Sequence, residues 1–251
     1  MSNAPQTSVW GDVMTKMIHR SERGFTIAEL VVAMALSGVL MAGIYSAYYS
    51  QQKSYIAQDQ VAEMQQNLRV ALYHLESEVR MAGYDPTREA DAGILIANLG
   101  EMRIAKDDNA DGDTNLGGDD LNEEIRYFLT NDANGDGVND DVDSGAACHL
   151  AKETGAGTEI AAEYIDAVRF VYLDEEGNIL DDDGSGNLIV SMDEVRAVQI
   201  TLVARTRRPD PGFVNGDSYL DQQDGTILAA QNDSFRRQRV SAEIKCRNLG
   251  L

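Results

Sequence analysis

The sequence has little of the residue chemistry on which most enzymes and metal centres depend. It holds two cysteines and three histidines in 251 residues, and neither cysteine belongs to a CxxC pair. A zinc site is therefore not expected. The histidines are scattered, and the chain contains no GxSxG, P-loop or dinucleotide-binding fingerprint. We expect that the protein is not an enzyme.

Positive charge is also scarce. The 21 Lys and Arg residues face 42 Asp and Glu residues, which gives a formal net charge of −21 at pH 7. A nucleic-acid-binding surface needs positive charge to meet the phosphates. We therefore expect no nucleic-acid partner for the acidic part of the chain. The excess of acid favours divalent cations or a salty exterior as its surroundings.

One long apolar run stands out from this background. Residues 25–47 contain a single charged side chain, Glu29, and about 23 apolar residues are enough to cross a bilayer as a helix. The positive-inside tendency leaves residues 1–24 in the cytoplasm, because basic residues gather there. No small-residue cleavage site closes the run, as a signal peptide would require. A carboxylate inside such a span is costly and is a functional candidate.

The residues around this acid carry a resemblance. Residues 23–30, RGFTIAEL, resemble the class III leader junction of type IV prepilins and type II secretion pseudopilins. The resemblance implies that a prepilin peptidase cuts after Gly24 and methylates the new first residue, Phe25. It also implies that Glu29 neutralises the amino terminus of a neighbouring subunit during assembly, since opposite charges in hydrocarbon are tolerated mainly as pairs. An ordinary signal anchor is the alternative, but it would not explain this junction.

The helical pattern continues beyond the apolar run. Apolar residues recur at steps of three and four: Val61, Met64, Leu68, Leu72, Leu75 and Val79. No proline interrupts before Pro86, and Gly83 is a credible stop signal. The pattern predicts one helix from about Phe25 to about Ala82, with an apolar stripe for a sheet on its second half. A coiled coil is the alternative interpretation of the stripe.

A second block extends the resemblance. Residues 66–84, QNLRVALYHLESEVRMAGY, resemble PilW-type minor pilins, and the J-type minor pseudopilins have a looser relative of this block. The resemblance implies the type IV pilin fold and a minor pilin that primes or caps a type IV pilus filament without catalysis. Its implied partners are prepilin peptidase, other minor and major pilins, and the inner membrane. A J-type pseudopilin of type II secretion and a calcium-dependent pilus-borne adhesin are the alternatives. The implied location is an inner-membrane, single-pass prepilin with a periplasmic C-terminus, and later a pilus or pseudopilus filament.

The rest of the chain predicts strands and acidic loops. Five runs have alternating or β-rich character: 125–129, 147–150, 167–173, 197–204 and 240–246. Residues 174–178 predict a hairpin turn, and residues 205–232 a long loop. A helix followed by an antiparallel sheet is an α+β arrangement. The predicted organisation is a leader (1–24), a transmembrane half-helix (25–47), an amphipathic half-helix (48–84) and a β-rich globular domain (85–251).

One acidic loop matches the spacing of a calcium site. In residues 132–143, DANGDGVNDDVD, oxygen ligands fall at places 1, 3, 5, 7, 9 and 12, with glycine at place 6. The candidate ligands are Asp132, Asn134, Asp136, Val138 (through its carbonyl), Asp140 and Asp143. Aspartate replaces the usual closing glutamate, and no helix pair flanks the loop. The prediction is a Ca²⁺ site, with a solvated acidic turn as the alternative.

Two further runs repeat part of this spacing. The first consists of Asp107, Asn109, Asp111, Gly112, Asp113 and Asn115, but its twelfth place is Gly118. The second consists of Asp181, Asp183, Ser185 and Gly186, and a turn is the simpler interpretation there. In each loop crowded carboxylates repel one another, and a hard cation would relieve that repulsion.

The two cysteines lie far apart in the sequence. The outward topology favours an oxidising compartment, where Cys148 and Cys246 are expected to form one disulfide. In the chain-entropy model such a bond would contribute about 3–5 kcal/mol. Two separate buried thiols are the alternative.

Overall fold

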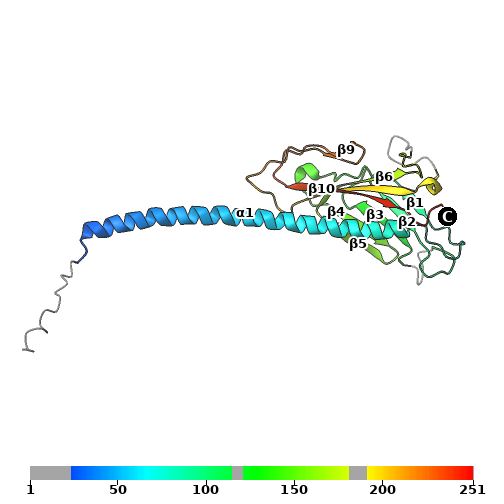
Figure 1. The fold of residues 1–251 in the computed structure, drawn as a ribbon, viewed down its shortest axis with the longest axis horizontal. Coiled ribbons are helices and arrows are strands. Elements are labelled where there is room, and N and C mark those ends of the chain that lie inside the picture. The colour runs from blue at the N-terminus through cyan, green and yellow to red at the C-terminus, as the bar shows by residue number, and fades with distance from the viewer. Residues whose placement is uncertain (1–23, 115–120, 181–190, 251) are drawn as a thin grey trace, which may run out of the picture. The chain divides into compact units, whose positions relative to one another are not determined.

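The computed structural model describes residues 24–114, 121–180 and 191–250. The leader up to residue 23 and the acidic run at 181–186 lie outside these residues. The chain divides into two compact units, Met1–Lys53 and Ser54–Leu251. One long helix, α1 (Ile27–Met81), contributes to both units, and Figure 1 shows it with the strands. Its bounds agree with the helix expected from about residue 25 to about residue 82.

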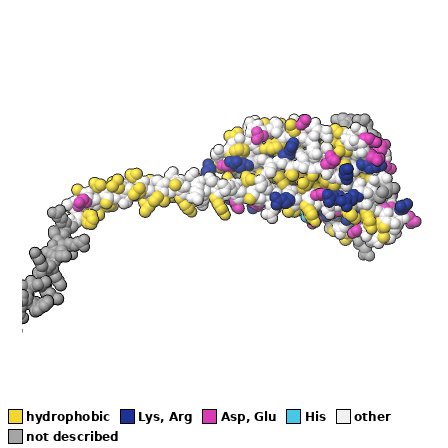
Figure 2. Space-filling view, in the orientation of Figure 1, with side chains coloured by type: hydrophobic (Ala, Val, Ile, Leu, Met, Phe, Trp, Pro, Cys, Tyr) yellow, Lys and Arg dark blue, Asp and Glu magenta, His cyan; other side chains and the backbone are white. Residues whose placement is uncertain are grey.

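The described part of the first unit consists of a short lead-in and α1 up to Lys53. Large apolar side chains from Leu30 to Tyr49 are exposed along this segment, as Figure 2 shows. The most apolar 18-residue window of α1 has a mean hydropathy of 2.2, and none of it is buried. Among the described residues, α1 is the one helix long and apolar enough to cross a membrane.

The second unit contains the amphipathic part of α1. The predicted stripe is buried at Met64, Leu68, Ala71, Leu75 and Val79, while Val61 and Leu72 are half-buried. The helix ends where the sequence predicts. Gly83 adopts a φ of 76°, which favours glycine, and its N–H donates to the carbonyl of Ala105 at 3.0 Å. The chain therefore leaves the helix bonded to a strand.

The strands of the second unit form three antiparallel sheets. A five-stranded sheet has the order β1-β2-β3-β4-β5, and its strands are Ile94–Ala97, Met102–Ala105, Glu124–Leu129, His149–Thr154 and Gly157–Glu163. A three-stranded sheet has the order β10-β7-β6, with β6 at Ile165–Leu173, β7 at Ala197–Arg205 and β10 at Arg237–Lys245. A small third sheet pairs β8 (Tyr219–Leu220) with β9 (Thr226–Leu228). The described residues of this unit also include two 3-10 turns, η1 (Val142–Ser144) and η2 (Met192–Glu194).

The α+β fold class is confirmed: one long helix packs on antiparallel sheets. The five predicted β runs correspond to β3, β4, β6, β7 and β10. The predicted hairpin is present after β6, where the N–H of Asp174 donates to the carbonyl of Asn178 at 3.0 Å. The sequence did not predict β1, β2 and β5, because the first two are four residues long and β5 is mostly exposed.

The core shows why β7 is buried at every one of its nine positions. One face of the strand, including Ile200 and Leu202, shares a cluster with the α1 stripe. The other face, at Val203, joins a smaller cluster with Ile227 and Leu228. The predicted long loop thus contains β8 and β9 and covers the second face of the sheet.

Buried charge also joins these strands. Asp166 on β6 is fully buried, with its carboxylate 2.7 Å from Arg237 Nε and 3.4 Å from Arg205 Nε. Arg237 also pairs with Asp233 at 2.7 Å. Burial raises the pKa of Asp166, and the two guanidinium groups oppose that rise. Removing one member would leave buried charge unpaired, so the cluster fixes how β6, β7 and β10 pack.

Candidate processing and assembly site

The predicted cleavage junction lies in open surroundings. Gly24 and Phe25 precede the first residue of α1 and are not helical. A Cβ atom built on Gly24 would meet no heavy atom within 4 Å. The Phe25 side chain is 89% exposed. A protease needs accessible, non-helical backbone at its cleavage site, and residues 24 and 25 are exposed and lie outside the helix.

Glu29 lies in the first turn of α1 and takes part in a capping box. Its backbone N–H donates to Thr26 Oγ1 at 3.2 Å, and its Oε2 accepts from the Thr26 N–H and hydroxyl at 2.9 Å each. These reciprocal bonds satisfy backbone donors that every helix start leaves open. Thr26 was not among the residues predicted from the sequence, although the T-x-x-E spacing of a capping box indicates it.

The capping box satisfies one oxygen of Glu29 but does not neutralise its charge. Within the described residues no Lys, Arg or His forms an ion pair with Glu29, and Oε1 accepts no hydrogen bond. The helix N-terminus favours a negative charge only modestly. Among the described residues the carboxylate therefore keeps both an unbonded oxygen and an uncompensated charge.

In the predicted calcium loop, side-chain oxygens accept hydrogen bonds from the backbone N–H groups of the same loop. Asp132 accepts from the N–H groups of Gly135 and Gly137 at 2.7 and 2.8 Å. Asn134 Oδ1 accepts from the Asp136 N–H at 3.0 Å, and Asp136 Oδ1 from the Val138 N–H at 2.8 Å. Burial raises the pKa of Asp132, and the backbone hydrogen bonds oppose that rise. The loop thus brings the first three predicted ligands together.

The later candidate ligands are held differently. Asp140 Oδ2 accepts from the Ala133 N–H at 2.7 Å, whereas Asp143 lies exposed in η1. Gly137 packs so closely on β6 that an added Cβ would lie 2.2 Å from the carbonyl oxygen of Val168, so packing also requires this glycine. In the described part of the chain no group of three or more His, Cys, Asp or Glu is already placed to hold a metal ion. The Ca²⁺ site stays a prediction.

The two cysteines are not bonded to each other, which corrects the disulfide prediction. Both are free, buried thiols. Cys148 precedes β4 of the five-stranded sheet, with its Sγ 3.8 Å from Thr130 Oγ1, and Cys246 follows β10 of the other sheet. Burial raises the pKa of both thiols, that of Cys246 to about 12. The reactive thiolate is therefore disfavoured at both positions.

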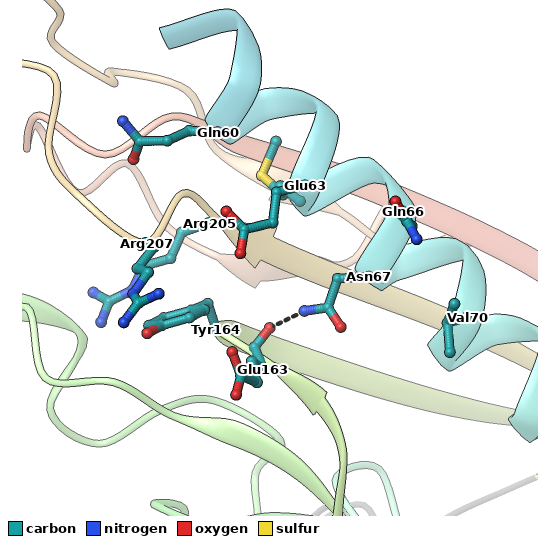
Figure 3. A pocket seen from close by; sticks show the side chains of 10 residues that line it. Gln60, Glu63, Gln66, Asn67, Val70, Glu163, Tyr164, Arg205 and Arg207 are labelled. Atoms are coloured by element: carbon teal, nitrogen blue, oxygen red, sulfur yellow. Dashed lines mark hydrogen bonds between the residues drawn. The ribbon is translucent and has the colours of Figure 1, made fainter. Parts of the chain in front are cut away.

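Figure 3 shows a pocket of about 310 Å³ in the second unit. It lies between α1, the turn before β6 and the end of β7. There the Asn67 amide donates to the carbonyl of Glu163 beside Tyr164, Arg205 and Arg207. The residues that line it include no serine, cysteine or histidine.

One comparison with known proteins, a protein-family motif, covers the junction. Residues 19–45 match the prokaryotic N-terminal methylation motif, and this range contains Gly24, Phe25 and Glu29. A type IV-like pilin from Thermus thermophilus is similar in structure over 75% of this chain and 100% of its own, with 15% identity and a TM-score of 0.47. No curated protein matches the sequence.

The motif bears on how the chain is processed and assembled. It implies processing by prepilin peptidase and assembly with other pilins. The apolar helix that follows it fits a membrane-anchored pilin, which is a structural protein. The chain thus carries a prokaryotic N-terminal methylation motif at residues 19–45, in front of a long helix packed on antiparallel sheets.

Proposed function

We propose that this chain is a PilW-type minor pilin that primes or caps the assembly of a type IV pilus filament. The uncompensated charge of Glu29 on an exposed apolar helix carries the proposal. In hydrocarbon such a charge needs a cationic partner. Cleavage after Gly24 would create an amine at Phe25 of a second subunit, and that amine is a cation of the required kind. On this proposal the chain is anchored in the inner membrane with a periplasmic C-terminus and then enters the filament.

Two features support a minor rather than a major subunit. Many major pilins carry a proline in the middle of the helix near position 46, whereas this chain has Ser46 and α1 continues through it without a break. The acidic loops at 107–113 and 132–143 enlarge the domain beyond its helix and sheets.

The proposal is tested by removing the chain from cells and counting surface filaments. We expect few or no filaments, because a priming subunit acts before the major subunit can polymerise. Restoring the full chain should restore the count. A pilus-borne adhesin gives the reverse result, with normal filament numbers and lost surface binding, and that result would overturn the proposal.

We also propose that residues 132–143 bind Ca²⁺. Hard oxygen donors from Asp132, Asn134 and Asp136 surround one turn, and their hydrogen bonds already fix that turn. Binding to the native state alone adds RT ln(1 + [L]/Kd), about 2.7 kcal/mol when calcium is 100 times its Kd. Calcium should therefore raise the melting temperature of the full chain in detergent.

The variant that tests this loop is Asp136→Asn. Its matched control is Glu176→Gln, which removes one charge from the hairpin turn after β6. Asp136→Asn keeps an oxygen for the Val138 N–H but removes a charge. We expect it to reduce the calcium-dependent rise in melting temperature, whereas Glu176→Gln leaves the rise unchanged. A wild-type melting curve that is the same in EDTA and in calcium would remove this loop from consideration.

A further inference from the structure

A second acidic loop, at Asp107–Asp113, has the same hydrogen-bond pattern as the loop at Asp132. Asp107 accepts from the N–H groups of Ala110 and Gly112 at 2.6 and 3.2 Å. Asn109 Oδ1 accepts from the Asp111 N–H at 2.8 Å, and Asp111 Oδ1 from the Asp113 N–H at 3.1 Å. The pattern shows that both loops adopt one type of turn, but by itself it does not indicate a ligand.

A buried glutamate outside the loop, Glu123, contacts it from the position directly before β3. The residue is 3% exposed, and its Oε1 accepts from the N–H groups of Asp108 and Asn109 at 2.8 and 3.2 Å. Its other oxygen, Oε2, is buried and has no hydrogen-bond partner in the described part of the chain. Because Oε1 is bonded to the second and third residues of the loop, the carboxylate that carries the unpartnered Oε2 is in direct contact with the loop.

The charges around this turn are unbalanced. Asp107 is fully buried, and within the described residues neither Asp107 nor Glu123 forms an ion pair with Lys, Arg or His. Lys106, the nearest basic residue in sequence, is directed to Glu78 at 3.4 Å. Hydrogen bonds from backbone N–H groups satisfy the Asp107 oxygens but add no positive charge. Two buried carboxylates without a counter-charge are costly, and a bound cation would remove that cost.

We propose that Asp107, Asn109, Asp111 and Glu123, with the backbone carbonyl of Asp113, bind one Ca²⁺ ion. Calcium takes carboxylate, amide and carbonyl oxygens together, and its loops are usually closed by a glutamate. Glu123 provides that glutamate from outside the loop, sixteen residues beyond Asp107. The Asn109 amide donates to Asp111 Oδ2 at 3.0 Å, and both side chains are exposed. On this proposal the side chains of Asn109 and Asp111 turn toward Glu123 when the ion binds. The inference does not depend on the assignment as a pilin.

The test uses the full chain in detergent, in an Asp136→Asn background that weakens the other acidic loop. Glu123→Gln keeps an oxygen for the Asp108 and Asn109 N–H groups and removes the charge. Glu124→Gln is the matched control, since it changes the net charge equally at the next residue, which pairs with Arg103 instead. Calcium affinity is measured by titration calorimetry, and melting temperature is measured in EDTA and in calcium.

We expect Glu123→Gln to bind Ca²⁺ at least about 10-fold more weakly than the background chain, and Glu124→Gln to match the background. In EDTA the Glu123→Gln chain should melt at or above the background temperature, because an unpaired buried charge has been removed. If Glu123 only caps the loop, the variant melts lower by the same amount in EDTA and in calcium. That result, or equal calcium affinity in both variants, overturns the proposal.

Discussion

Replacing Gly24 with valine should produce cells in which the chain keeps residues 1–24. The fold of the described residues does not oppose the substitution, because a Cβ at Gly24 would meet no heavy atom within 4 Å. Any block therefore arises at the peptidase, which must fit the residue before the cleaved bond. Mass spectrometry of the N-terminus is the measurement: wild type should begin at a methylated Phe25, and Gly24→Val should retain its leader.

Gly43→Val is the matched control for this experiment. Gly43 lies in α1, and a Cβ there also meets nothing within 4 Å, so the same side chain is added to the same segment without a clash. This variant should be processed like wild type. If Gly24→Val and wild type yield the same N-terminus, residues 24 and 25 are not the processing site. If Gly43→Val also keeps the leader, the effect of Gly24→Val is not specific to the junction.

Changing Glu29 to alanine should leave membrane insertion intact and abolish filament assembly. Alanine makes the apolar segment more apolar, so insertion is not impaired. In a packed filament, however, the amine of the neighbouring chain would lose its partner. An unpaired buried charge costs about 3–5 kcal/mol, which lowers each subunit's association constant by more than about 100-fold. Membrane fractionation measures insertion, and filament counts measure assembly.

Thr26→Val separates the pairing role of Glu29 from its role in the capping box. Valine removes the hydroxyl that bonds Glu29 but keeps the carboxylate and the side-chain shape. Loss of a cap costs about 1 kcal/mol, so this variant should assemble far better than Glu29→Ala. Equal loss in the two variants would show that Glu29 acts by capping its own helix. Wild-type filament numbers in Glu29→Ala would remove Glu29 from the assembly mechanism.

The strongly periodic elements were predictable from the sequence. The α1 helix combines an apolar run, a stripe at steps of three and four, and a glycine stop, all of which are local patterns. The strands β6, β7 and β10 are nine residues each and rich in β-branched or alternating residues. The short strands β1 and β2 were missed, since four residues carry too little periodicity to be distinguished from a loop.

The candidate sites divide in the same way. The residues Gly24, Phe25 and Glu29 were found because they form one contiguous motif whose spacing is itself the signal. The structure has Cys148 and Cys246 as free, buried thiols, and the spacing of cysteines in a sequence does not reveal whether two of them are bonded. Glu123 was not predicted as a ligand, because the spacing rule for calcium loops covers only residues within the loop and Glu123 lies outside it.

The sequence alone determined the apolar helix, the leader junction, the acid within the span and the α+β class, because helix periodicity and short motifs depend on neighbouring residues. Only the tertiary structure decided that the cysteines are free thiols, that the predicted long loop covers one face of β7, and that Glu123 contacts the loop at Asp107. Those outcomes depend on which distant segments pack together, and packing is settled by the burial of the whole core rather than by any local pattern.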